Sequence, residues 1–214
     1  ELPSELQQQK PDAIHFYGAG ASSESLKGRV VHGLQQVFPQ SQLEVEHDLL
    51  GSARALCGSR PGIATILGTG SNACEFDGRA ISAQSGGIGY ILGDEGSGTD
   101  LGRRWLQHFF YGELPDDLHQ AFQTEVRPDK ATIIDQVYRQ PDANRYLASY
   151  AEFLGRHQQH PFVRELVKTA FATFLKRHVL RFGYAFQYPV HSVGSIAYYF
   201  YDIWQDALAE HQLE

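Results

Sequence analysis

The sequence contains no methionine and only two cysteines, Cys57 and Cys74. Neither cysteine belongs to a C-x-x-C pair, so we expect neither a disulfide framework nor a structural zinc site. No apolar run approaches the roughly 20 residues that cross a bilayer, and no signal-peptide pattern is present. These absences predict a cytoplasmic protein without a membrane segment.

An excess of positive charge is also lacking. The chain has 18 Lys and Arg residues against 25 Asp and Glu residues, which gives a net charge of −7. Surfaces that bind nucleic acid or anionic lipid need clustered positive charge, so neither partner is expected. The 214 residues suffice for one large domain or two small lobes. Because the chain begins at Glu1 and has no methionine, we expect that it is part of a longer protein or that modified methionines are missing from it.

The first part of the chain alternates between strand and helix patterns. We expect buried strands at residues 12–17 and 63–67, an alternating strand at residues 43–46, and helices at residues 23–37 and 48–58. Such alternation is typical of an α/β layer whose strands pair in parallel.

The second part has mainly helical patterns. Helices are expected near residues 98–110, 114–124, 131–137 and 146–155, and one long helix is expected from about Pro161 to Phe182. A strand at residues 190–193 then precedes the turn Gly194-Ser195 and a final helix that starts at Ile196. The second part of the chain therefore differs in character from the first.

A glycine turn follows the strand at residues 63–67. Gly68-x-Gly70-x-x-Ala73 matches the dinucleotide fingerprint, which requires that a helix start at the turn. Residues 72–76 instead read as a strand, and Asp77-Gly78 favours a type I′ hairpin turn before a further strand. We therefore expect a β-hairpin whose tip, residues 68–71, exposes consecutive backbone N–H groups to an anion. The alternative is a glycine-rich hairpin with a purely structural role.

Asp48 is expected at the end of a strand and the start of a helix. In an α/β sheet this is the carboxyl edge, where ligands bind. The helix N-terminus should lower the pKa of the carboxylate and keep it ionised. A carboxylate of this kind suits phosphoryl transfer, in which the enzyme mainly positions the attacking hydroxyl. An ordinary N-cap is the alternative.

Glycine is concentrated just before the helix at residues 98–110. Six glycines fall between residues 86 and 98: Gly86, Gly87, Gly89, Gly93, Gly96 and Gly98. Glycine is entropically costly, so such a segment favours close approach of a ligand or of another backbone. Asp94 and Glu95 lie within it, and a carboxylate there could accept hydrogen bonds from two sugar hydroxyls. Capping of the following helix is the alternative.

Three of these segments together carry a family resemblance. In order along the chain, "ILGTGSN", "GYILGDEGSG" and "VGSIAYY" resemble the N-acetylglucosamine kinases and related BadF/BadG-type ATPases, and the segment from Asp48 to Gly58 resembles their bacterial branch. These proteins belong to the actin, hexokinase and heat-shock-ATPase superfamily. The resemblance implies a two-lobed α/β, ribonuclease H-like fold with added helices in the second lobe, ATP and Mg²⁺ in the cleft, and a possible homodimer.

The resemblance also implies roles for individual residues. Asp48 corresponds to the aspartate that orients and deprotonates the sugar hydroxyl, and Gly18-Ala19-Gly20 corresponds to a loop on the sugar side. The remaining matches are Gly68, Thr69, Gly70 and Ser71 for phosphate, Asn72, Gly87, Asp94 and again Thr69 for the sugar, and Gly194 and Ser195 for adenosine.

One family element has no counterpart here. Nothing in residues 1–60 resembles the Asp-x-Gly-x-Thr hairpin, the first phosphate loop, whose aspartate helps to hold Mg²⁺. No metal ligand is therefore assigned in this chain. We expect residues 1–60 to be the remainder of the first lobe and residues 61–214 to be the second lobe.

The leading hypothesis is an ATP-dependent kinase that phosphorylates a hexosamine, N-acetylglucosamine at its 6-hydroxyl. An ATPase that activates a partner enzyme through an iron–sulfur cluster is a second hypothesis, although Cys57 and Cys74 do not lie beside one glycine turn as such clusters require. A non-catalytic, sugar-sensing regulator is a third, and the absence of the first hairpin keeps it open.

Overall fold

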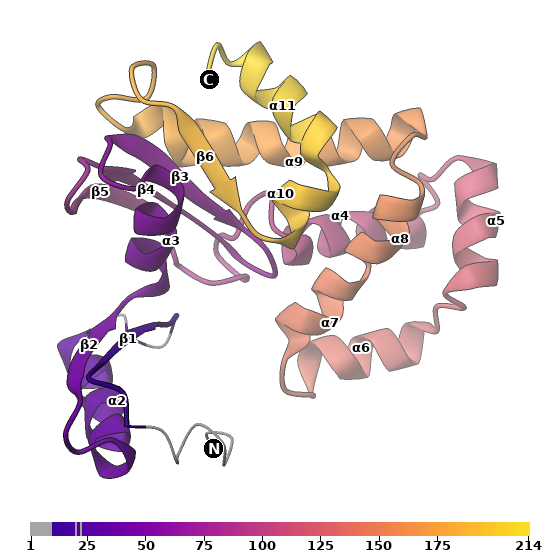
Figure 1. Cartoon of the computed structure of the whole chain (residues 1–214). Coiled ribbons are helices and arrows are strands. Elements are labelled where there is room, and N and C mark those ends of the chain that lie inside the picture. The colour runs from indigo at the N-terminus through magenta and orange to yellow at the C-terminus, as the bar shows by residue number, and fades with distance from the viewer. Residues whose placement is uncertain (1–9, 20, 22) are drawn as a thin grey trace.

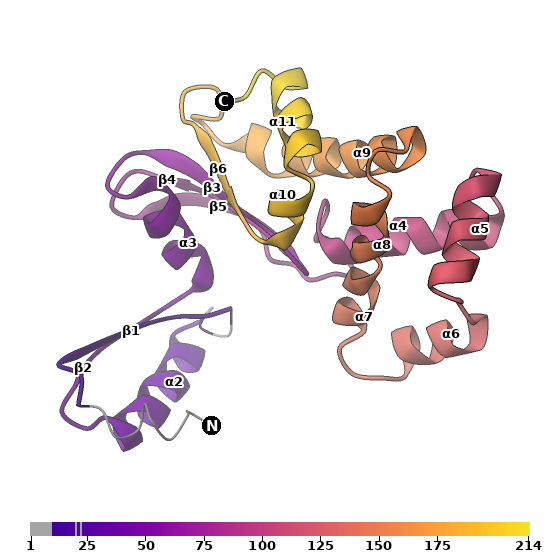
Figure 2. The ribbon, with the colours of Figure 1, turned by 45° about the vertical axis from the view of Figure 1, so that its right-hand side comes forward.

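The computed structural model describes residues 10–19, 21 and 23–214. Of the predicted turn Gly18-Ala19-Gly20, Gly20 lies outside the described residues. Figure 1 shows a small N-terminal unit joined through one helix to a larger body, in which a sheet carries helices and a group of helices extends to one side. Figure 2 gives the same arrangement from another side. No helix in the described ranges is both long and apolar enough to span a membrane.

The N-terminal unit consists of β1 (Ala13–Tyr17), α2 (Glu24–Val37) and β2 (Gln42–Glu46). The two strands pair in parallel, as expected, and Ser23 caps α2 by accepting a hydrogen bond from Leu26 N. The prediction of a buried first strand is wrong. β1 has three exposed residues of five and α2 has no buried residue, because the described part of this unit offers no further layer to cover them.

Helix α3 (Asp48–Cys57) connects the N-terminal unit to the body. Its N-cap is His47 rather than Asp48, since Nδ1 of His47 accepts the hydrogen bond from Leu49 N at 3.2 Å and Asp48 is already the first helical residue. The interpretation of Asp48 as an N-cap is therefore wrong. Gly58, with φ of +62°, ends the helix as predicted.

The body is built on a four-stranded sheet with the order β5-β4-β3-β6. β3 (Gly62–Leu67) pairs antiparallel with β4 (Ser71–Phe76), and β4 pairs antiparallel with β5 (Ile81–Gly86). β6 (Val190–Val193) pairs in parallel with β3. The hairpin predicted with its tip at residues 68–71 is thus confirmed, with Ser71 already in β4. The chain that leaves the tip is a strand, which excludes a dinucleotide fingerprint.

The alternation of side chains along β3 and β4 separates two cores. Ala64, Cys74 and Phe76 lie on the face covered by α3, where they contact Leu49 and Ala53. Ile63, Leu67 and Ala73 point the other way, into the large core shared with the C-terminal helices. The sheet is therefore the middle of three layers, with α3 on one face and α9 and α11 on the other (Figure 1).

The turn between β4 and β5 differs from the predicted type I′ turn. Phe76 pairs with Ile81, so four residues connect the strands. Only Gly78 of the central dipeptide has a positive φ, +97°, whereas type I′ requires one at both central positions. The carboxylate of Asp77 instead accepts hydrogen bonds from Arg79 N at 2.7 Å and Ala80 N at 2.8 Å, which stabilises the longer turn.

The helices follow the predicted order, but two of the predicted helices are each divided into two and the long helix is shorter than predicted. Their bounds are α4 (Gly98–Tyr111), α5 (Asp116–Glu125), α6 (Lys130–Tyr138), α7 (Ala143–Ser149), α8 (Ala151–Arg156), α9 (Pro161–Arg177), α10 (Ser195–Tyr199) and α11 (Tyr201–Glu210). The helix predicted near residues 146–155 is split at Tyr150, and the final helix is split at Phe200. The long helix ends at His178, after which residues 179–181 form a 3₁₀ turn.

Candidate active site

Three turns meet at the edge of the sheet where β3 and β6 end. The N-terminus of α4 touches the hairpin tip, because Gly98 N donates to the carbonyl oxygen of Gly68 at 2.8 Å. The turn after β6 lies against the same tip: a Cβ at Gly194 would be 2.2 Å from the carbonyl oxygen of Leu67. Gly194 has φ of +116°, so both its conformation and its surroundings require glycine. The structure therefore brings the predicted phosphate and adenosine turns together.

The hairpin tip presents fewer free amides than the sequence predicts. Gly68 N closes the turn on Gly70 O at 3.0 Å, and Ser71 N donates to Oδ1 of Asp94 at 3.3 Å. Within the described ranges, the N–H groups of Thr69 and Gly70 have no acceptor. The expected array of four exposed N–H groups is thus reduced to two, because a tight turn uses one of its own amides and Asp94 occupies another.

Asp94 is held against the hairpin tip. A Cβ at Gly70 would lie 2.9 Å from Oδ2 of Asp94, so the absence of a side chain there lets the carboxylate approach. The backbone of Asp94 is left-handed, with φ of +59°, which is uncommon outside glycine and often marks functional turns. Burial raises the pKa of Asp94, and the nearby carboxylates of Glu95 and Asp100 raise it further, while Ser71 N–H opposes them.

Asn72 and Gly87 lie next to each other, as the shared sugar assignment requires. Asn72 pairs with Gly86 across β4 and β5. A Cβ at Gly87 would be 3.4 Å from Nδ2 of Asn72, and Gly87 has φ of +72°. Position 87 therefore favours glycine mainly because of its backbone conformation. The loop that leads to Asp94 begins here.

Asp48 lies at the same edge of the sheet. A Cβ at Gly62 would be 2.8 Å from Sγ of Cys57, so the end of α3 lies beside the start of β3 and the start of α3 lies toward the other end of β3. A Cβ at Gly51, in the first turn of α3, would be 2.7 Å from the ring of Tyr17, the last residue of β1. The first turn of α3 therefore adjoins the carboxyl ends of strands from both sheets, which is the expected location of a ligand site.

Two buried oxygens at this edge lack hydrogen-bond partners. In the part of the chain that the structure describes, Oδ1 of Asp48 and Oγ of Ser71 are buried and form no hydrogen bond. Nδ1 of His47 lies 3.0 Å from Oδ1 of Asp48, but this nitrogen already accepts from Leu49 N. Buried polar atoms are normally paired, so two unpaired oxygens mark this edge as a candidate site for a polar ligand.

Sequence reasoning missed a buried network behind Asp94. Glu95 is 6% exposed, its Oε2 lies 2.9 Å from Nε2 of His178, and Arg177 pairs with its Oε1. Nδ1 of the same His178 lies 2.9 Å from Oγ of Ser85. Burial alone would raise the pKa of Glu95, but the hydrogen bonds from His178, Arg177 and the backbone outweigh it and lower the pKa.

The turn at Gly194-Ser195 is flanked by two cavities. One, of about 370 Å³, is lined by Gly194, Tyr198 and Trp204 among others. The second, of about 660 Å³, is lined by Ser195, Tyr199 and residues of α7 and α8. Aromatic side chains beside backbone turns suit a planar base, so these cavities are compatible with the predicted adenosine contact.

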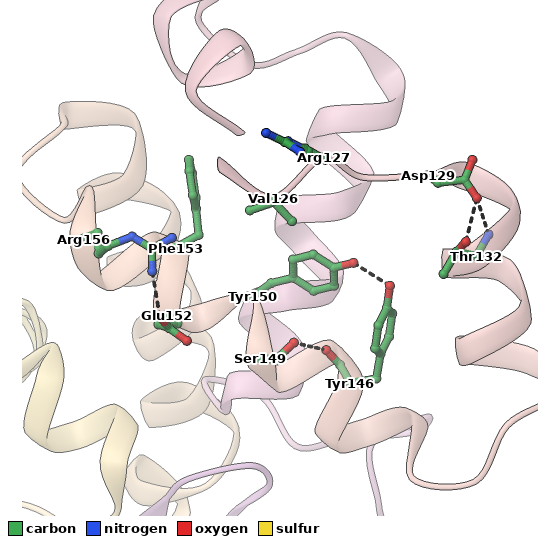
Figure 3. Close-up of a pocket in the computed structure, with 10 residues that line it drawn as sticks. All are labelled: Val126, Arg127, Asp129, Thr132, Tyr146, Ser149, Tyr150, Glu152, Phe153 and Arg156. Atoms are coloured by element: carbon green, nitrogen blue, oxygen red, sulfur yellow. Dashed lines mark hydrogen bonds and ion pairs between the residues drawn. The ribbon is translucent and has the colours of Figure 1, made fainter. Parts of the chain in front are cut away.

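A further cavity lies away from the three turns. It has a volume of about 380 Å³ and lies between α7, α8 and the connection from α5 to α6. Figure 3 shows Tyr150 and Tyr146 pointing toward each other there, with their hydroxyl oxygens 2.8 Å apart. None of the predicted site residues lines it, so we do not include it in the candidate site.

No group of residues in the described ranges is suited to hold a metal ion through three or more His, Cys, Asp or Glu side chains. Cys57, the last residue of α3, and Cys74 of β4 are both buried, and burial raises the pKa of both thiols, that of Cys74 to about 12. Such thiols are poor metal ligands, since binding requires the thiolate.

Comparison with solved structures identifies two informative neighbours. A protein from Porphyromonas gingivalis, provisionally assigned as an N-acetylglucosamine kinase, superposes with a TM-score of 0.90 and 42% identity over 94% of this chain and 71% of its own. A protein from Chromobacterium violaceum with the same provisional assignment has a TM-score of 0.71 and 21% identity over 92% of this chain and 70% of its own, and shows likeness of fold. The α/β, actin-like ATPase fold class predicted from the motifs is confirmed.

Among curated proteins, an N-acetylmuramic acid/N-acetylglucosamine kinase from Clostridium acetobutylicum is 54% identical over 43 residues. This match covers 20% of the present chain and 14% of that kinase. No family model matches the sequence. The similarity to the Porphyromonas protein therefore shows the family to which the chain belongs. The curated kinase adds a short segment of high identity.

Proposed function

The chain belongs to the family of N-acetylglucosamine kinases, and we propose that it phosphorylates a hexosamine, N-acetylglucosamine at its 6-hydroxyl, with ATP as the donor. The observation that carries this proposal is the meeting of three turns at one edge of the sheet, with two buried and unpaired oxygens beside them. The 42% identity to the Porphyromonas protein supports the choice of substrate class.

The phosphate groups are proposed to bind at the hairpin tip. The free N–H groups of Thr69 and Gly70 would donate to anionic oxygens, and the unpaired hydroxyl of Ser71 would add a hydrogen bond. Gly68 would contribute by closing the turn rather than by binding directly. Amides fixed before the reaction stabilise developing charge without reorganising, which is the main contribution that an enzyme makes to phosphoryl transfer.

The sugar is proposed to bind between the hairpin and the glycine loop, which we define as residues 86–94. Asn72, Gly87 and Asp94 would contact it, and Thr69 would lie between the sugar and the phosphates. Asp94 suits this role because its Oδ1 receives only a 3.3 Å hydrogen bond from Ser71, so that the carboxylate retains capacity for sugar hydroxyls.

Asp48 is proposed to act on the attacking hydroxyl. Its unpaired Oδ1 would accept the hydrogen bond of that hydroxyl, orient its oxygen toward the phosphate and take its proton as the bond forms. His47, whose nitrogen lies 3.0 Å from the same oxygen, would border this position.

Gly194 and Ser195 are proposed to bind adenosine, with the flanking cavities holding the base. ATP supplies the phosphoryl group, and Mg²⁺ would neutralise phosphate charge through ligands outside the residues assigned here. The hairpin tip, which Gly194 contacts, would then face the phosphate end of the same nucleotide.

A coupled ADP-release assay on the full-length protein tests the proposal, with N-acetylglucosamine, N-acetylmuramic acid, N-acetylmannosamine and glucose as acceptors. N-acetylglucosamine should stimulate ADP release most strongly. Asp48→Asn should reduce kcat by about 100-fold or more, because general-base catalysis commonly contributes that much. Asp116→Asn, in the first turn of α5, is the matched control and should leave kcat unchanged.

Three outcomes would contradict the proposal. If Asp48→Asn keeps the kcat of the native protein, the role of Asp48 is wrong. If no sugar stimulates ADP release whereas a protein partner does, the protein is an activating ATPase. If it binds sugar but releases no ADP, it is a sugar-sensing protein.

A further inference from the structure

A buried histidine joins the two ends of the glycine loop. His178, the C-cap of α9, is 6% exposed. Its Nδ1 lies 2.9 Å from Oγ of Ser85, which immediately precedes the loop, and its Nε2 lies 2.9 Å from Oε2 of Glu95, which immediately follows it. The imidazole ring therefore bridges the strand that enters the loop and the turn that leaves it.

Neutral imidazole satisfies both partners of this bridge. Nε2–H donates to the carboxylate of Glu95, and Nδ1 accepts the hydroxyl hydrogen of Ser85. Arg177 adds a second donor to Glu95, and the ring of His178 packs on Phe174 with centroids 5.1 Å apart. A buried polar network whose members are all paired is rigid and specifies one arrangement.

The loop itself has little to hold it in place. Its internal backbone hydrogen bonds, within the described ranges, run from Leu92 N and Gly93 N to Gly89 O. Ile88, Ile91 and Leu92 are 61%, 76% and 74% exposed, so these side chains do not anchor it in the core. Tyr90 packs, partly buried, against the large core, and Ser71 N donates to Asp94 at 3.3 Å. The position of one end of the loop relative to the other therefore depends mainly on the hydrogen bonds made at those ends.

We propose that His178 is a positioning residue for the sugar, because its bridge between Ser85 and Glu95 fixes Gly87 and Asp94 relative to each other. The part that concerns the sugar rests on the proposed function, whereas the bridge does not. His178 acts through the loop, and the hairpin tip has its own backbone hydrogen bonds to α4. Loss of the bridge should therefore weaken sugar binding and leave nucleotide binding unchanged.

Steady-state kinetics of the full-length protein test this proposal with a matched control. His178→Ala should raise the KM for sugar by about tenfold, the effect expected when hydrogen bonds to a charged group are lost, and leave the KM for ATP unchanged. His178→Gln, whose amide can still donate to Glu95, should raise the KM for sugar less than His178→Ala does. His211→Ala should change neither KM, because His211 is also a helix C-cap but its Nδ1 bonds to Ala207 O, 2.8 Å away in α11.

Amide hydrogen exchange of the unliganded protein gives a second readout that needs no turnover. His178→Ala should speed exchange at Gly93 and Ser97, whose amides donate to Gly89 O and Asp94 O, and His211→Ala should not. If His178→Ala speeds this exchange but the native protein phosphorylates no sugar, the proposed function is wrong and the role of the His178 bridge in holding the loop is supported.

Unchanged exchange together with unchanged sugar KM in an active kinase would refute the bridge. An equal rise in the KM for sugar and for ATP would refute it as well, because it would indicate a general loss of structure. If His178→Ala does not fold, Ser85→Ala, which removes one hydrogen bond of the bridge, is expected to give the same split between the two KM values and decides the question.

Discussion

The hairpin tip and the glycine loop differ in what holds them. At the tip, residues 68–70, backbone carbonyl oxygens accept the hydrogen bonds from the start of α4: Gly98 N donates to Gly68 O at 2.8 Å, and the backbone N and the hydroxyl of Thr99 donate to Thr69 O at 3.2 Å and 2.6 Å. The glycine loop is fixed at its ends by side chains, through Ser85, Glu95 and His178. The tip contributes only backbone atoms to these bonds, so one of its own residues can be replaced without losing them where a new side chain has space.

Two adjacent carboxylates show the same contrast within a single turn. Glu95 is buried and bonded to His178 and Arg177, and its pKa is lowered. Asp94 receives one long hydrogen bond, and burial raises its pKa. Glu95 therefore stabilises the folded protein, whereas Asp94 is kept at a cost to stability, which is typical of residues that serve a ligand.

The largest expected effect comes from Gly194, where the adenosine turn is pressed against the hairpin. Gly194→Ala would place a Cβ 2.2 Å from Leu67 O at a residue with φ of +116°. We expect the free energy of unfolding to fall by about 3 kcal/mol or more, measured by urea denaturation.

Gly68→Ala, at the tip itself, is the control for this substitution. A Cβ at Gly68 would meet no atom within 4 Å. Its unfolding free energy should stay within about 1 kcal/mol of the native value. If Gly194→Ala and Gly68→Ala lower the free energy of unfolding by similar amounts, the close contact between Gly194 and Leu67 O is not the cause of the loss.

A smaller effect should separate Glu95 from Asp94. Glu95→Gln should lower the free energy of unfolding at pH 7 by about 1–3 kcal/mol, because His178 and Arg177 lose their charged acceptor. Asp94→Asn should raise the unfolding free energy slightly at neutral pH and weaken sugar binding, and asparagine tolerates the left-handed φ of +59°. Thermal unfolding monitored between pH 3 and pH 8 measures both changes.

The pH dependence of the two carboxylates has opposite signs. With a lowered pKa in the folded state, Glu95 contributes stability above its ordinary value near 4.5 and loses it as the pH falls through the folded pKa. With a raised pKa, Asp94 favours the protonated form on folding, so stability falls as the pH rises from its ordinary value near 3.8 through the raised pKa. Stability changes of the same sign in both variants would contradict this assignment.

The sequence was sufficient to predict the features that depend on local pattern. The strand, glycine turn and strand at residues 62–76 follow from alternation and from the absence of a helical period after Gly70. The end of α3 at Gly58 follows from the preference for glycine after the last turn of a helix. The resemblance assigned the turns at Gly68 and Gly194 to phosphate and adenosine, and the structure brings these turns into contact, because Gly194 lies against Leu67 O.

Features that depend on distant residues could not be predicted. His178 and Glu95 are 83 residues apart, and a lone histidine in an apolar helix gives no signal of its partner. The use of the Ser71 amide by Asp94 and the capping of α3 by His47 depend on side-chain placement at turns. The roles assigned to the individual site residues and the lobe boundary near residue 60 remain predictions.

Amide chemical shifts test the central claim most directly, namely that the backbone of the hairpin tip binds the phosphates and the glycine loop binds the sugar. A ¹⁵N-labelled sample would be titrated first with a non-hydrolysable ATP analogue and then with N-acetylglucosamine. We predict that the nucleotide shifts the amide resonances of Thr69 and Gly70, and that the sugar shifts those of Asn72, Gly87 and Asp94. A nucleotide that binds without perturbing Thr69 and Gly70 would contradict the account.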